Sequence, residues 1–144
     1  MTFLLAALLQ DGSQVFLSEE EALKVVFPNG EMILRRDVTL DSAAHAAVEE
    51  RLRRRVESTY RLFVAHREGE AVGYAVIAEE VTKTLTMTFI VGVDPKGRVI
   101  DVAVLEHKEK IGADSAKRKF LDQLRGKTID DPIRRKKDMV YVGG

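Results

Sequence analysis

Residues 72–106 read VGYAVIAEEVTKTLTMTFIVGVDPKGRVIDVAVLE, and this stretch decides the fold. Thr86–Val93 is rich in β-branched and apolar residues, and Val99–Leu105 alternates in part, as strands of a half-buried sheet do. The sequence DPKG at 94–97 suits the turn between them, because Asp favours the first position, Pro fixes φ at the second and Gly tolerates the last. We therefore predict an antiparallel hairpin within a meander of strands.

Further strands are predicted on both sides of this hairpin. Segments rich in β-branched and apolar residues indicate strands at Glu31–Val38, Tyr60–Ala65 and Val72–Ala78. A hairpin turn is predicted at Arg67–Glu70, and a last strand begins at Met139. Consecutive strands with short connections favour antiparallel pairing.

Three helices are predicted from their caps. The sequence SEEE at 18–21 is a capping box, in which Ser18 accepts a hydrogen bond from the backbone amide of Glu21. Asp41 is the predicted N-cap of a helix that runs from Ser42 to about Glu57. Asp114 or Ser115 caps a short third helix that runs to about Leu124, with Gly126 as its C-terminal stop. The predicted buried faces carry Leu23, Val26 and Phe27 in the first helix, Ala44, Val48, Leu52 and Val56 in the second, and Phe120, Leu121 and Leu124 in the third. The fold class is α+β, with helices packed on an antiparallel sheet.

Composition limits the size and partners of this domain. The chain has 144 residues, of which 45% are hydrophobic, so it is long enough for one domain over residues 1–144. Lys plus Arg and Asp plus Glu both number 23, so no net charge attracts nucleic acid, which we exclude as a partner. Cysteine is absent, which removes disulfides and thiolate chemistry.

The N-terminal segment contains the apolar run FLLAALL at Phe3–Leu9. It is much shorter than the roughly 20 residues of a membrane-spanning helix. Two interpretations of residues 1–14 stay open: the remnant of a signal peptide without its basic start, or an ordinary packing segment.

The commonest enzyme signatures are missing from the sequence. It contains no GxGxxG, GxxxxGK[ST], HExxH or GxSxG motif, and its histidines, His45, His66 and His107, lack the spacing of metal ligands. No nucleophile with a recognisable base supports a hydrolytic or group-transfer enzyme. Residues 126–128, GKT, resemble half of a phosphate loop but fit the C-terminal cap of a helix better.

Two basic runs invite an anion-binding interpretation. The first comprises Arg51 and residues 53–55, and we assign it a structural role, because Glu49 with Arg53 and Glu50 with Arg54 have i,i+4 spacing on the predicted helix. The second, RRKK at 134–137, is equally compatible with a solvated segment and with binding to a phosphate or a partner protein.

Four blocks of sequence resemble a known family. They are VFLSEEEALKVVFP at 15–28, VGYAVI at 72–77, TFIVGVDPKGRVIDVAVLEHKE at 88–109 and FLDQLRGKTIDDPIR at 120–134, the last followed by RKKD. Their order and spacing are similar to the bacterial FMN-binding domain family, which includes the flavin-carrying subunits of sodium-translocating NADH:quinone reductase and of the related ferredoxin-linked membrane complex. The resemblance covers nearly the whole chain from Val15 to Gly144.

The resemblance implies a twisted antiparallel sheet, an extracytoplasmic or periplasmic location and FMN as cofactor. In many members a flavin transferase joins FMN through its phosphate to a threonine in the motif Ser/Ala-Gly-Ala-Thr-x-Ser/Thr. Gly143 and Gly144 match the first two positions of this motif, and the sequence as given stops before the threonine. Covalent attachment is therefore not expected in this chain as given. Three explanations stay open: a truncated sequence, an omitted tail, or a member that binds flavin weakly or not at all.

The expected flavin lies between the loop at His107–Gly112 and the C-terminal segment at Asp138–Gly144. The loop reads EKIG at 109–112, where relatives often have Glu-Thr-Pro-Gly or Glu-Ser-Tyr-Gly, so only its first and last residues match. Glycines permit close backbone approach and cations suit the phosphate. The candidate cofactor-binding residues are Glu109, Lys110, Gly112, Lys127, Arg134, Gly143 and Gly144.

We expect an FMN-binding electron-transfer domain that is not a catalyst by itself, because the cofactor carries the redox chemistry. Its expected partners are a redox protein or a membrane electron-transport complex, and a flavin transferase where a full-length form has the threonine. The alternative is a flavin-free ligand-binding or protein-interaction domain on the same scaffold.

Overall fold

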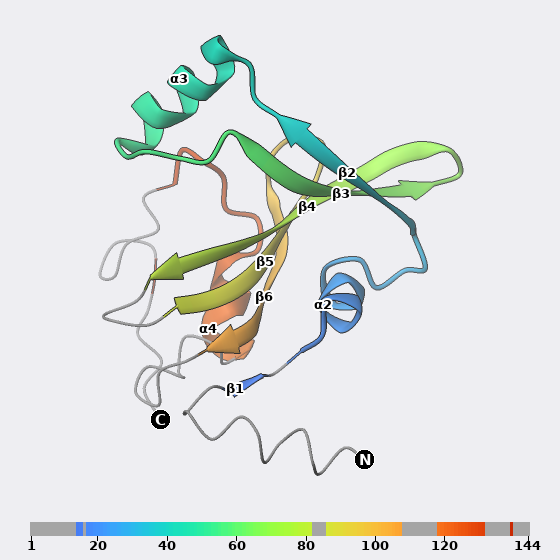
Figure 1. The fold of residues 1–144 in the computed structure, drawn as a ribbon. Coiled ribbons are helices and arrows are strands. Elements are labelled where there is room, and N and C mark those ends of the chain that lie inside the picture. The colour runs from blue at the N-terminus through green and yellow to red at the C-terminus, as the bar shows by residue number, and fades with distance from the viewer. Residues whose placement is uncertain (1–13, 16, 82–85, 108–117, 132–138, 140–144) are drawn as a thin grey trace, which may run out of the picture.

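A single antiparallel sheet organises the computed structural model, which describes residues 14–15, 17–81, 86–107, 118–131 and 139. Its six strands lie in the order β1-β6-β5-β4-β3-β2 (Figure 1). The strands from β2 to β6 form a meander, and the short β1 pairs with β6. Their bounds are Gln14–Val15 for β1, Met32–Thr39 for β2, Thr59–Arg67 for β3, Glu70–Val81 for β4, Thr86–Val93 for β5 and Val99–His107 for β6. The predicted meander is therefore confirmed.

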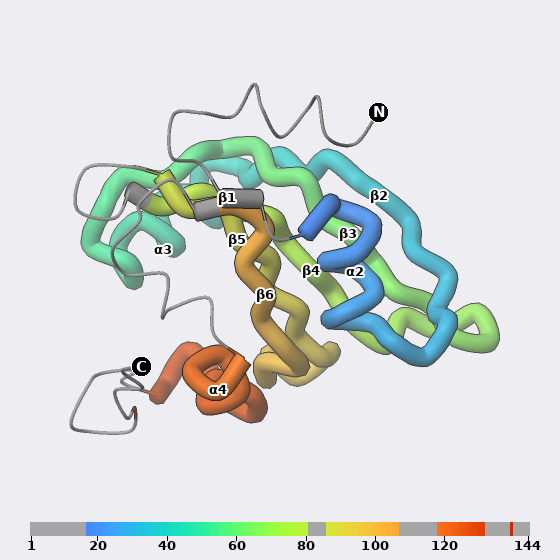
Figure 2. Tube along the Cα trace, turned by 90° about the horizontal axis from the view of Figure 1, so that it is seen from below, coloured from blue at the N-terminus to red at the C-terminus, as the bar shows by residue number. Residues whose placement is uncertain are grey.

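Helices cover both faces of this sheet over β5 and β6, which makes the fold α+β, as predicted. The helix α2 (Glu19–Val26) packs on one face, and α4 (Arg118–Leu121) with the 3-10 helix η2 (Asp122–Leu124) packs on the other (Figure 2). Neighbouring residues of β6 divide between the two cores, since Ala103 belongs to the core under α2 and Val102 and Val104 to the core under α4.

Local sequence explains the start of α2. Ser18 is its N-cap and accepts a hydrogen bond from the backbone amide of Glu21 at 3.1 Å, as the capping box predicts. Ala22, Val26 and Phe27 are buried in the core between α2 and the sheet. The side chain predicted to join them, Leu23, is only partly buried.

Two glycines let α2 lie directly on the sheet. A Cβ atom on Gly92 of β5 would lie 2.9 Å from the Cβ of Val26, and a Cβ on Gly73 of β4 would lie 2.6 Å from the Cε1 of Phe27. Contacts below 3.0 Å force something to shift. Glycine is therefore required at both positions by the close approach of the helix.

The second helix corrects the sequence prediction. Helix α3 spans Ser42–Leu52, with Asp41 as its N-cap, and ends five residues before the predicted end at Glu57 because Arg53 adopts left-handed backbone with φ of 53°. No residue of α3 is buried, and Leu52 is 49% exposed. The predicted buried face, which included Ala44, Val48 and Val56, is therefore wrong.

Contacts of Val56 explain why α3 stops. The Val56 backbone amide donates to Glu49 Oε1 at 3.1 Å, and its carbonyl accepts from His45 Nε2 at 2.9 Å. These bonds fold the chain back against the last turns of the helix, so the helix does not continue. Helix α3 consequently lies beyond the end of the sheet (Figure 1).

Near the C-terminus, Leu121 is buried against β6, with Phe120 and Leu124 packed beside it. Gly126, with φ of 78°, follows η2 and confirms the predicted helix stop. The predicted caps Asp114 and Ser115, the segment Phe3–Leu9 and residues 140–142 of the last strand lie outside the described residues. Within the described residues, no helix combines the length and apolar character that a bilayer-spanning helix requires.

Replacing Gly73 tests the close packing of α2. We expect Gly73→Ala to lower the free energy of unfolding by about 1–3 kcal/mol, because the new methyl group collides with the Phe27 ring. Phe27→Leu should partly relieve this collision, so in urea denaturation the double variant should lose less than the sum of the two single losses. Strict additivity would contradict the proposed contact.

Candidate ligand site where the sheet divides

The sheet divides at one end because the β3–β4 ladder is shorter than its neighbours. Pairing of β2 with β3 continues to Thr39–Thr59, and pairing of β4 with β5 continues to Val81–Thr86. Pairing of β3 with β4 stops at Leu62–Val76. Beyond this pair, β2 and β3 run away from β4, which Figure 1 shows as a fork.

A β-bulge lies in the same ladder. The register of β3 against β4 shifts between Ala65 and His66. Bulges increase the local twist of a strand pair. This register shift lies near the β3–β4 turn, at the opposite end of the ladder from the fork.

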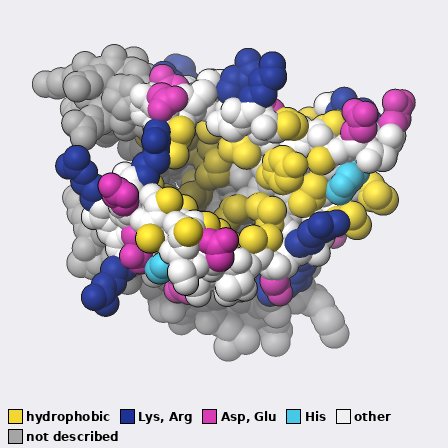
Figure 3. All heavy atoms as spheres, turned by 90° about the horizontal axis from the view of Figure 1, so that it is seen from above, with side chains coloured by type: hydrophobic (Ala, Val, Ile, Leu, Met, Phe, Trp, Pro, Cys, Tyr) yellow, Lys and Arg dark blue, Asp and Glu magenta, His cyan; other side chains and the backbone are white. Residues whose placement is uncertain are grey.

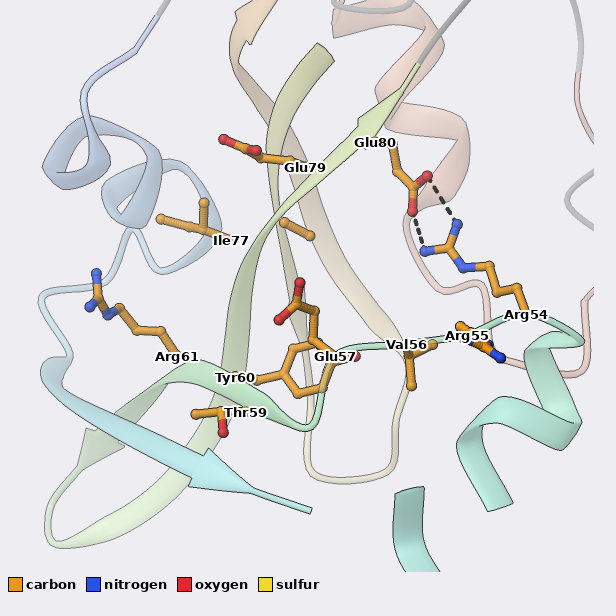
Figure 4. A pocket seen from close by; sticks show the side chains of 11 residues that line it. Arg54, Arg55, Val56, Glu57, Thr59, Tyr60, Arg61, Ile77, Glu79 and Glu80 are labelled. Atoms are coloured by element: carbon orange, nitrogen blue, oxygen red, sulfur yellow. Dashed lines mark hydrogen bonds and ion pairs between the residues drawn. The ribbon is translucent and has the colours of Figure 1, made fainter. Parts of the chain in front are cut away.

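A pocket of about 310 Å³ occupies the fork (Figure 4). Its walls are residues 54–57 after α3, residues 59–61 of β3 and residues 77–80 of β4. Tyr60 contributes an aromatic ring and Ile77 an aliphatic side chain to this lining. We call this cavity the fork pocket.

In the fork pocket, β3 and β4 line the walls but do not pair with each other. Neighbouring antiparallel strands satisfy alternate N–H and C=O groups by bonding to each other. Past Leu62–Val76, no hydrogen bond links residues 59–61 to residues 77–80 in the part of the chain that the structure describes. A ligand edge with donors and acceptors can bond to such groups, as an added strand does.

An arginine–carboxylate pair fixes the mouth of the fork pocket. The guanidinium of Arg54 donates two hydrogen bonds to the carboxylate of Glu80, at 3.0 and 2.5 Å. These bonds from Arg54 lower the pKa of Glu80, and the same pairing raises the pKa of Arg54. The loop after α3 is thereby tied to the end of β4.

The predicted pairing within the first basic run is wrong. Arg54 pairs with Glu80 instead of Glu50, and Arg51 pairs with Asp130 at 2.9 Å. Arg53 lies outside the helix, so it cannot keep the i,i+4 geometry with Glu49. The run still has a structural role, but its partners come from other elements.

Two further arginines line the fork pocket. Arg55 makes no ion pair within the described residues, whereas Arg61 Nε lies 3.7 Å from Asp37 Oδ1. The pocket also contains Glu57 and Glu79, so its three arginines face three glutamates when Arg54 and Glu80 are included. Arg55 is therefore the cation best placed to bind an anionic group of a ligand.

Among the predicted cofactor-binding residues, only Lys127 is described. Its carbonyl accepts a hydrogen bond from the Val99 amide at 2.8 Å, which places it beside the start of β6. The loop that begins after His107 leaves the other end of β6, roughly 26 Å away at about 3.3 Å per residue. Glu109, Lys110, Gly112, Arg134, Gly143 and Gly144 lie outside the described residues.

The fork pocket and the predicted flavin loop share one end of the sheet. His107 pairs with Met87 at the start of β5, next to the Val81–Thr86 pair that ends the β4–β5 ladder. Sequence patterns did not identify the fork pocket, because Tyr60 and Ile77 are ordinary strand residues. The lengths of the three ladders reveal it.

A buried carboxylate on the opposite end of β6 has a structural role. Asp101, whose side chain is 8% exposed, bonds to Arg118 and to Arg125, the latter at 3.0 Å. Arg118 also donates to the Val102 carbonyl at 3.0 Å. These bonds fasten α4 and η2 to β6, so Arg118 and Arg125 both have a structural role.

Histidines and carboxylates do not form a metal centre in the described part of the chain, where no group of three or more potential ligands lies together. His45 is bound to the Val56 carbonyl, and His66 lies at the β3 bulge with its Nδ1 buried and unpaired.

Asp101→Ala should detach the C-terminal helices from β6. We expect a loss of about 1–3 kcal/mol in the free energy of unfolding, because two charge-assisted hydrogen bonds disappear. Limited proteolysis should cleave after Arg118 or Arg125 faster than in the wild type. Asp122→Ala, which removes a more exposed carboxylate on the same arginines, should cost less; an equal cost would contradict the role of Asp101.

The Arg54–Glu80 pair predicts a pH dependence of stability. The pKa of Glu80 in the fold is below its ordinary value of 4.5, so the pair stabilises the protein above that pH. This stability is lost as the pH falls through the folded-state pKa. Between pH 7 and pH 3, Glu80→Gln should lose less stability than the wild type, by under about 1 kcal/mol for a partly exposed pair. Arg54→Gln should show the same reduced pH dependence in urea denaturation, and a wild-type profile in either variant would contradict it.

Known proteins were compared with the chain in three ways. No protein-family model, no curated protein and no solved structure matches it. The resemblance to the FMN-binding domain family therefore rests on the order and spacing of the four sequence blocks.

Proposed function

We propose that this chain is an FMN-binding electron-transfer domain and that the flavin ring binds in the fork pocket. The observation that supports this location is the unpaired strand backbone beside Tyr60, at the end of the sheet from which the predicted flavin loop departs. We propose FMN and not another ligand because the four sequence blocks resemble the FMN-binding domain family.

The fork pocket has the chemistry that an isoalloxazine requires. Such a ring needs an apolar slot and a few polar groups along its heteroatom edge. Tyr60 and Ile77 provide apolar surface, and the free N–H and C=O groups of β3 and β4 provide donors and acceptors. The aromatic ring of Tyr60 can stack on a planar ligand.

The phosphate of FMN needs a cation that is not already neutralised. Arg54 is engaged by Glu80, whereas Arg55 has no ion pair within the described residues. A guanidinium binds phosphate with two parallel hydrogen bonds. Arg55 is therefore assigned to the phosphate, and the Arg54–Glu80 pair to holding the adjoining loop in place.

When bound, FMN supplies the redox chemistry, while the protein binds and orients it and limits its contact with water. The proposal includes a redox partner protein or membrane electron-transport complex and an extracytoplasmic location, both implied by the family resemblance. The proposal includes a flavin transferase as a partner only for a form of the protein that contains the acceptor threonine.

A flavin-free ligand-binding or protein-interaction domain is the second candidate. The balanced charge of the fork pocket favours it, because Glu57 and Glu79 oppose a phosphate. An extended peptide would also satisfy the unpaired backbone of β3 and β4 by adding a strand.

Titration with FMN distinguishes the two candidates. We expect quenching of flavin fluorescence by the wild-type chain, and roughly tenfold weaker binding by Arg55→Asn, because a charge-assisted hydrogen bond is worth about 1.5–3 kcal/mol. Tyr60→Leu should weaken binding about three- to tenfold through loss of stacking.

The matched control is Arg53→Asn, which removes a neighbouring cation outside the pocket while asparagine tolerates the left-handed backbone there. Fluorescence that stays unquenched at tens of micromolar protein would refute FMN binding. Tight binding that is unaffected by both pocket substitutions would place the flavin elsewhere.

A further inference from the structure

The sheet ends at β2, whose outer edge has no partner strand in the described part of the chain. This edge is long and regular, since β2 pairs with β3 without a break from Met32–His66 to Thr39–Thr59. Its sequence, MILRRDVT, contains no proline, and seven of its eight residues are exposed. Proteins usually protect such edges with prolines, bulges, short strands or charged side chains, and of these β2 has only the charges of Arg35, Arg36 and Asp37. β2 therefore offers an open template for strand pairing.

The two faces of β2 differ in chemistry. Leu34 and Val38 share a face with their β3 partners Val64 and Tyr60, and they remain 38% and 37% exposed. Arg36 lies between them on the same face, and the opposite face carries Ile33, Arg35 and Asp37. Arg35 makes no ion pair within the described residues, and Asp37 makes only the 3.7 Å contact with Arg61.

We propose that β2 pairs antiparallel with β2 of a second copy of this chain, with Arg36 on the two-fold axis. In this register Arg35 lies opposite Asp37 of the second copy, and Leu34 lies opposite Val38 of the second copy. Both pairs occur twice by symmetry, which is how an isologous interface forms. Opposite charges and apolar pairs across strands are the contacts that stabilise a sheet.

The proposed register also extends the rows of cross-strand side chains that β2 and β3 form within each copy. On one face, Val64 and Leu34 would continue into Val38 and Tyr60 of the second copy, giving an apolar row over four strands. On the other face, Arg35 would join the Asp37–Arg61 pair of the second copy, giving alternating charges. The cost is the pair of Arg36 side chains on the axis, which carry like charges.

Neighbouring registers lack this complementarity. With Arg35 on the axis, Leu34 would oppose Arg36 and Ile33 would oppose Asp37. With Asp37 on the axis, its carboxylate would face the Asp37 carboxylate of the second copy. Arg36 would then oppose Val38 of the second copy. Only the two-fold axis at Arg36 gives Arg35–Asp37 pairs and an apolar pair together.

Sedimentation of the full chain over a range of concentrations tests the charge pairs. The wild type should form dimers, and Arg35→Asp or Asp37→Arg should each weaken dimerisation at least about tenfold by placing like charges opposite each other. The double variant Arg35→Asp/Asp37→Arg restores the pairs with reversed sign and should dimerise within about threefold of the wild type. Lys96→Asp, on the exposed β5–β6 turn, is the control of matched charge change and should leave dimerisation unchanged.

Cysteine cross-linking tests the register, because the natural sequence has no cysteine. Arg36→Cys should form a disulfide-linked dimer on mild oxidation, since the two side chains meet on the axis. Arg35→Cys should not, because the two copies of residue 35 are diagonal and not facing neighbours in this register, and Cα atoms more than about 7 Å apart cannot be bridged. A chain that stays monomeric at several hundred micromolar, or equal cross-linking at both positions, would overturn the proposal. Either result would leave FMN binding untouched.

Discussion

The structure depends on the direct contact of α2 with the backbone of the sheet. Gly73 and Gly92 leave no side chain between the helix and strands β4 and β5, so Val26 and Phe27 reach into the core. This contact buries one face of the sheet with a helix of only eight residues. The α2 contacts lie over β5 and β6, whereas the fork opens between β3 and β4, past the Leu62–Val76 pair.

The two ends of β6 have different roles. At the Val99 end, Asp101 with two arginines and the Lys127 carbonyl hold the C-terminal helices against the strand. At the His107 end, β6 stays paired with β5 and β1, and the fork pocket with its mixed charges lies farther along the same end of the sheet, between β3 and β4. Rigid anchoring at one end and an open pocket at the other suit a domain that holds a ligand on a fixed scaffold.

Features with short-range causes could be predicted from the sequence. The DPKG turn is one, since Asp94 accepts hydrogen bonds from the amides of Lys96 and Arg98, and Gly97 has φ of 79°. The Ser18 cap is another. Both need only side chains and backbone within a few residues, so local patterns identify them.

Features with long-range causes could not be predicted. The early end of α3 depends on Val56 returning to Glu49 and His45, and the partner of Arg54 comes from β4. The fork pocket depends on how far each ladder extends, and the pattern of residues within a single strand does not specify this length. Of the candidate cofactor-binding residues predicted from the sequence, Lys127 is the one that the structure describes.

The short β3–β4 ladder also affects how the protein moves. Its six registered pairs connect the β2–β3 strand pair to the rest of the sheet. Phe63 and Ala65 anchor this strand pair in the core, whereas past Leu62 β3 pairs with β2 alone among the described strands. Amide protons near Thr39 and Thr59 are then expected to exchange with solvent through local opening, without global unfolding. The pocket wall formed by residues 59–61 can thus adjust to a bound molecule while the helix-covered core stays folded.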